Sequence, residues 1–183
     1  MSFGKAYKHF KTITRHRHMV IRHCFKAGIP WQGLRHDLSK YAPAEFCIGA
    51  KYYAGDHSPN EDERRAKGYS AAWLRHKGRN KHHFEYWTDY DVKTHMSTPV
   101  KMPLKYVIEM FCDRVAASKI YKGKAYTDRS AYEYFASAKN TRSIHPQTSA
   151  FLEMLLIMLC EEGEDRTFSY IRNYLKTHRD YEA

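Results

Sequence analysis

The amino-acid sequence predicts an all-α protein, folded as a single-domain helical bundle. Apolar residues recur with a period of about 3.6 residues in several long stretches, and no stretch of useful length shows the alternation of a strand. Proline, glycine and capping residues stand where such helices would begin and end. At 183 residues the chain has the size of one domain, so we expect one domain over residues 1–183.

The first predicted helix covers residues 3–27, which contain no proline and carry an apolar stripe that stops at Gly28. His16 and His23 are seven residues apart and share a face, whereas His18 lies on another. The histidines of this helix therefore cannot all reach one point.

A short helical turn is expected to carry the His36-Asp37 doublet. Adjacent side chains diverge by about 100° on a helix, so both can reach a metal only where the element ends or where two metals are bridged. Pro43 then opens a helix that reaches Tyr53.

The next predicted helix runs from Ser58 to Lys77. Ser58 and Glu61 have the spacing of a capping box. An apolar stripe with Trp73 brings His76 to the core side at the carboxyl end of the helix. After a break, another turn begins at His82-His83.

Residues 89–103 read as a polar connection, and residues 104–121 as a buried helix. Asp113 interrupts the apolar middle of that helix. A buried carboxylate is costly unless it is paired or bound to metal, so Asp113 either pairs with Arg114 or Lys119 or serves as a ligand.

Three further helices are expected over residues 127–139, 146–162 and 164–178, with Gly163 between the last two. They contain few chemically active side chains. We therefore interpret residues 127–180 as packing helices.

Composition narrows the possible partners. The formal net charge of +11 favours polyanionic partners, including nucleotides and nucleic acid, although a solvated basic surface is the simpler alternative. The four cysteines are far apart and lie in apolar contexts, as in a reduced, cytoplasmic protein. No signal peptide or membrane span is indicated.

A set of imidazoles and carboxylates predicts a metal site within about residues 15–120. Such a set, without thiolate, suits one or two divalent ions, with Fe, Mn or Zn favoured and Mg or Ni possible. The candidate ligands are His18 or a neighbouring histidine, His36, Asp37, His76, His82, His83 and Asp113.

Other side chains near these ligands suit phosphoester hydrolysis. Lys40, Lys77 and Arg79 are candidates to hold phosphate. Glu85 is a candidate to transfer protons, so the predicted catalytic residues are Glu85, Asp37 and Lys40.

An upstream histidine, the His36-Asp37 doublet and Asp113 together resemble the H…HD…D pattern of the HD superfamily of all-helical metal-dependent phosphohydrolases. Segments 32–41 (QGLRHDLSKY) and 76–87 (HKGRNKHHFEYW) resemble an uncharacterised bacterial and phage family. The remote resemblance implies an HD-domain-like bundle that hydrolyses a nucleotide or another phosphorylated small molecule.

Four alternatives remain open at this point. Di-iron oxygenases resemble the same superfamily pattern. A metal-free aromatic cluster beside a basic surface would suit nucleic-acid binding. His82, His83, Phe84, Tyr86 and Trp87 would also suit an aromatic, hydrogen-bonded corner of the core without metal. In the fourth alternative a bound metal serves only to stabilise the fold. The substrate and the oligomeric state are not indicated.

Overall fold

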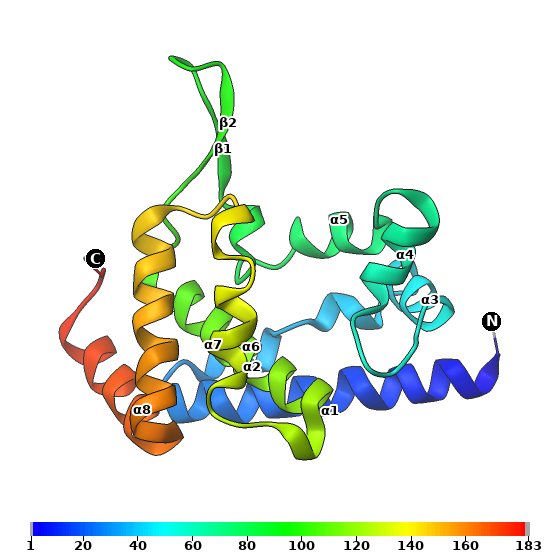
Figure 1. The fold of residues 1–183 in the computed structure, drawn as a ribbon, viewed down its shortest axis with the longest axis horizontal. Coiled ribbons are helices and arrows are strands. Elements are labelled where there is room, and N and C mark those ends of the chain that lie inside the picture. The colour runs from blue at the N-terminus through cyan, green and yellow to red at the C-terminus, as the bar shows by residue number, and fades with distance from the viewer. Residues whose placement is uncertain (1, 182–183) are drawn as a thin grey trace.

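The prediction of an all-α fold is confirmed. A computed structural model describes residues 2–181, and over this range eight α-helices form one body (Figure 1). The helices are α1 (Phe3–Ala27), α2 (Pro30–Arg35), α3 (Pro43–Lys51), α4 (Pro59–Lys67), α5 (Ala71–Lys77), α6 (Leu104–Lys122), α7 (Ser130–Ala136) and α8 (Pro146–Thr177). None of these helices is long and apolar enough to cross a membrane.

Helix α6 lies at the centre of the body, and its residues are buried around most of its circumference. It packs against α1, α7 and α8, and α1 also contacts α2 and α3. The apolar core joins one side of α6 to α1 and α8 through Val20, Cys24, Val107, Phe111, Val115, Leu152, Leu155 and Leu159. Polar side chains on the other side of α6 are therefore free to form a site.

Several helix ends follow their local signals. Helix α1 has the predicted bounds, and Gly28 after it has φ 86°, a conformation that suits glycine. Inside α8, Gly163 is non-helical with φ 78° and ψ 175°, so the predicted break there is confirmed. Helix α7 is shorter than predicted and is followed by a 3-10 turn, Lys139–Thr141.

The single helix predicted from Ser58 to Lys77 is wrong. Gly68, with φ 80°, ends α4, and the Ser70 hydroxyl starts α5 by accepting a hydrogen bond from the Trp73 N–H at 3.0 Å. The Ser70 hydroxyl in turn donates to the buried carboxylate of Glu63 at 2.7 Å. Two local signals thus outweighed a continuous apolar stripe.

The expectation that the chain contains no strand is wrong within the polar connection of residues 89–103. Strands β1 (Thr88–Asp91) and β2 (Met96–Pro99) form an antiparallel hairpin in which Thr88 faces Pro99. The hairpin projects away from the helices (Figure 1). Neither face of the hairpin is buried. Its sequence therefore lacks the alternation of apolar and polar residues by which a strand is predicted.

Candidate metal centre

The His36-Asp37 doublet lies at the break between α2 and a 3-10 turn, Leu38–Tyr41. His36 ends α2, and Asp37 has φ 55°. This break allows adjacent side chains to converge, and His36 Nε2 lies 3.2 Å from Asp37 Oδ2. Both residues are only 1% exposed. The doublet is thus at an element end, as its chemistry required.

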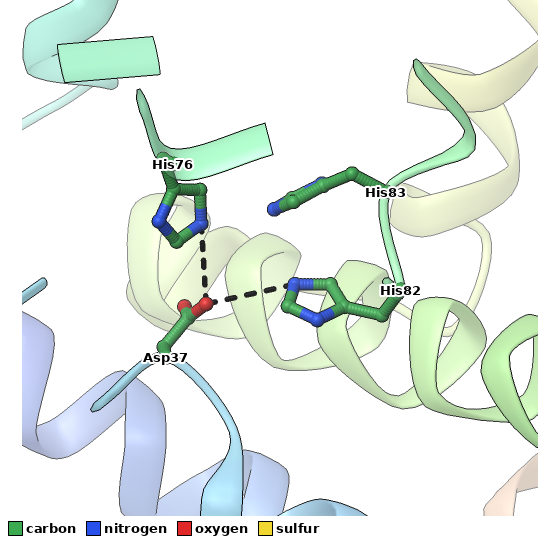
Figure 2. Close-up of side chains that lie close together, drawn as sticks. All are labelled: Asp37, His76, His82 and His83. Atoms are coloured by element: carbon green, nitrogen blue, oxygen red, sulfur yellow. Dashed lines mark ion pairs between the residues drawn. The ribbon is translucent and has the colours of Figure 1, made fainter. Parts of the chain in front are cut away.

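One side of the Asp37 carboxylate faces three imidazoles from α5 and the segment after it (Figure 2). Asp37 Oδ1 lies 3.2 Å from His76 Nε2 and 3.5 Å from His82 Nε2. His83 points its ring into the same space. We call Asp37, His76, His82 and His83 the first donor group.

The other side of Asp37 faces helices α1 and α6. His16 Nε2 lies 3.7 Å from Asp37 Oδ2 and 2.9 Å from Asp113 Oδ1. Asp113 Oδ1 is also 3.4 Å from His36 Nε2. These four residues form the second donor group. Asp37 belongs to both groups, so its carboxylate lies where it would bridge two ions.

Two buried glutamates set the orientation of three imidazoles. Glu109 Oε1 accepts hydrogen bonds from the Nδ1–H of His36 at 3.0 Å and of His82 at 3.1 Å. Glu45 Oε2 accepts one from the Nδ1–H of His76 at 2.9 Å. A proton held on Nδ1 leaves Nε2 as the free lone pair, which is the usual arrangement of metal-binding histidine.

The atoms that face the two donor groups lack hydrogen-bond partners. They are buried and comprise the Nε2 atoms of His16, His36, His76, His82 and His83, together with Asp37 Oδ1. Buried polar atoms are almost always satisfied, so six unsatisfied atoms in one place require an explanation.

A metal ion meets that requirement. Two ligands about 2.1 Å from one ion lie at most roughly 4.2 Å apart. The donor atoms of each group lie within 4.8 Å of one another, and the contacts of Asp37 and Asp113 with the imidazoles given above are 2.9–3.7 Å long. The donor set and its spacing therefore fit a divalent metal.

The carboxylates of both groups are ionised. Burial by itself raises the pKa of Asp37, but His36, Lys40 and His76 outweigh it and hold that pKa well below its usual range. His16 and His36 do the same for the pKa of Asp113. Burial lowers the pKa of His83 well below its usual range, helped by the charges of His82 and His76. Burial lowers the pKa of His36 and of His76, but Asp37 outweighs burial and raises both above the ordinary value. A metal bound at these two imidazoles would therefore displace a proton from each, whereas the carboxylates and His83 are already in the form that metal binding needs.

A cavity of about 600 Å³ opens beside both groups, and His16, His76, His83 and Asp113 line it. The predicted catalytic residues Lys40 and Glu85 line it as well. The Lys40 ammonium lies 2.5 Å from Asp37 Oδ2. A molecule in this cavity would contact the candidate metal ligands directly.

Three predicted site residues lie elsewhere. His18 is exposed on α1. Side chains two positions apart on a helix point about 200° away from each other, and His16 points inward. Lys77 and Arg79 do not line the cavity. The structure brings together His36, Asp37, His76, His82, His83 and Asp113.

Sequence reasoning missed His16 as a named ligand and both orienting glutamates. Glu109 is four residues before Asp113, a spacing that places both acids on one face of α6, and this signal was available. Glu45 gave no such signal, because an acid in the first turn of a helix is ordinary.

Comparison with known proteins identifies one family. No match is found among curated proteins or among solved structures. Residues 5–158 match DUF5662, a family of unknown function. That range contains both donor groups, both orienting glutamates and all the residues that line the cavity. The chain belongs to the DUF5662 family.

Proposed function

We propose that this protein is a metal-dependent phosphohydrolase that acts on a nucleotide or another phosphoester. One observation carries the proposal: two donor groups share the Asp37 carboxylate, and six of their inward atoms are buried without hydrogen-bond partners. Paired sites bridged by a carboxylate serve in phosphoester hydrolysis because two ions can stabilise both the attacking and the leaving oxygen.

Each donor group suits a borderline divalent metal. The first offers three imidazoles and one carboxylate, and the second offers two of each. Such ligands favour Fe, Mn or Zn, with Mg or Ni as further candidates. A metal held there supplies a Lewis acid and a water molecule of lowered pKa.

Lys40 would bind and orient the phosphoryl group. Burial lowers its pKa, but Asp37 and Asp113 outweigh burial and raise that pKa above its ordinary value, so Lys40 is cationic at neutral pH. Its ammonium lies at the edge of the second donor group and lines the cavity. A phosphate oxygen that enters there meets a fixed positive charge.

Glu85 would transfer the proton. Burial raises the pKa of this carboxyl group, and only weaker effects oppose it. Its Oε2 atom is buried, has no hydrogen-bond partner and belongs to a side chain that lines the cavity. A carboxyl group with a raised pKa and a free oxygen is suited to donate a proton to a leaving group.

A di-iron oxygenase is the second candidate, because the three imidazoles of the first group also suit iron. Elemental analysis of untagged protein gives the metal and its stoichiometry. Turnover of phosphomonoesters and nucleotides is then measured with and without chelator, beside oxygen consumption.

We expect one or two metal ions per protein molecule, and release of phosphate that a chelator abolishes. Asp37→Asn should lose both, because it removes the shared ligand. Iron with oxygen uptake and no phosphate release would favour the oxygenase, and protein that folds without metal and binds nucleic acid would refute both.

A further inference from the structure

Two arginines on the cavity wall have no acidic partner. Arg114 and Arg142 both line the cavity beside the donor groups. Among residues 2–181, no ion pair joins either guanidinium to a carboxylate. Both guanidinium groups therefore lie in the cavity wall without a carboxylate of the described chain at ion-pair distance.

Arg114 follows Asp113 on α6, so the two side chains leave the helix about 100° apart. Asp113 joins the second donor group while Arg114 lines the same cavity. Arg114 Nε is buried without a hydrogen-bond partner. One of the two terminal nitrogens, Nη2, donates to the weak acceptor Met110 Sδ at 4.0 Å. The Arg114 side chain is half-buried, and a buried N–H donor such as its Nε is costly when no acceptor meets it.

Arg142 is held in place by the end of α7, which packs against α6. Its terminal nitrogens donate to the carbonyl oxygens of Phe135 and Tyr134, both at 3.3 Å, and its guanidinium lies 5.1 Å from the centre of the Tyr134 ring. Burial and the charge of Arg142 lower the pKa of Arg114. Both arginines line one cavity, and both remain charged because arginine does not deprotonate in proteins.

The acids that line the cavity do not neutralise these arginines. Asp113 contacts His16 and Glu45 contacts His76. Glu85 forms no ion pair with either arginine among the described residues, and its Oε2 atom has no hydrogen-bond partner. A bound anion would accept a hydrogen bond from Arg114 Nε and would pair with the two guanidinium charges.

We infer that Arg114 and Arg142 form a subsite for a second oxyanion of the substrate. The inference rests on the proposed function and narrows it: the substrate is a phosphoester with a further phosphate or carboxylate group, as in a nucleoside diphosphate. One oxyanion would lie at the donor groups with Lys40, and the other at the arginine pair, whose planar donors match phosphate and carboxylate.

The test measures anion binding without turnover. Metal-free full-length protein is titrated calorimetrically with inorganic phosphate and separately with acetate, with chloride at matched ionic strength as the reference. Arg114→Gln and Arg142→Gln are compared with Arg166→Gln, a control that removes an exposed arginine outside the cavity. Phosphate should also raise the melting temperature of the wild type.

We expect phosphate binding to weaken at least about tenfold in each of the two cavity variants, as for loss of one charge-assisted hydrogen bond, and to be unchanged in Arg166→Gln. Binding of phosphate alone or of both anions supports the subsite and identifies the oxyanion. No binding by the wild type, or equal binding by all variants, overturns it. If the protein binds phosphate in this way but hydrolyses no phosphoester, the proposed function fails and the anion subsite stands.

Discussion

Replacing Glu109 with glutamine should weaken metal binding while leaving every proposed ligand in place. Glu109 is 5% exposed, and one of its oxygens accepts hydrogen bonds from both His36 and His82. Burial raises the pKa of Glu109, but these two imidazoles outweigh burial and lower it. The carboxylate is therefore ionised, and both hydrogen bonds are charge-assisted.

The size of the effect follows from those two contacts. Charge-assisted hydrogen bonds are about twice as strong as neutral ones, which contribute about 1 kcal/mol each. A glutamine carbonyl keeps two neutral bonds, so the loss is about 2 kcal/mol, or roughly a 30-fold weaker affinity. This value lies within the range of about 10- to 100-fold measured when residues that orient metal ligands are replaced.

The assay is a competition between metal-free protein and a chelator of known affinity, monitored for Mn²⁺ and Zn²⁺. Glu63→Gln is the matched control, because Glu63 is fully buried and accepts hydrogen bonds from Ser70 and Ala72 but belongs to neither donor group. The control should lose stability without losing metal affinity. Equal metal affinity in Glu109→Gln and wild type would refute the role of Glu109, and equal losses in both variants would show a general effect of destabilisation.

Three other predictions test particular contacts. His16→Ala should lose metal from the second donor group, whereas His18→Ala should keep the full stoichiometry in elemental analysis, because only His16 faces the group. Gly49→Ala should destabilise the fold by about 1–3 kcal/mol in chemical denaturation, because the added Cβ would lie 2.5 Å from Nε2 of the buried His9; unchanged stability would mean that the His9 ring can move aside. Burial lowers the pKa of His23 to about 4, so between pH 6.5 and about pH 4 the unfolded chain binds a proton that the folded chain does not. Stability should therefore fall by about 3 kcal/mol as pH drops through that range, and His23→Gln should remove this part of the pH dependence; equal pH profiles for the two proteins would contradict it.

Local signals predicted the helices well where they acted alone. Gly28 ends α1 and Gly163 interrupts α8 because glycine adopts positive φ without strain. The predictions failed where two signals competed. At residues 68–70 a glycine and a capping serine divide an apolar stripe that has the pattern of one helix. The hydrogen bond from Ser70 to Glu63 stabilises this break.

The candidate site shows a similar division. The types of donor residue and the doublet could be read from the sequence, and the structure brings six of the seven predicted ligands together. His16 lies three residues after Ile13 and four before Val20, on the stripe that α1 buries, so the sequence did carry a signal that favours His16 over His18. Lys77 and Arg79 were chosen for closeness in sequence to His76, yet Arg114 and Arg142, from distant segments, line the cavity.

The sequence by itself determined the helices and the chemical kind of the site, since both depend on which residues are neighbours along the chain. Only the tertiary structure decided that Asp37 is shared between two donor groups, that Glu109 orients two imidazoles, and that two arginines face the same cavity. These relations join α1, α2, α5, α6 and the segment after α7, and they exist only once those elements have packed.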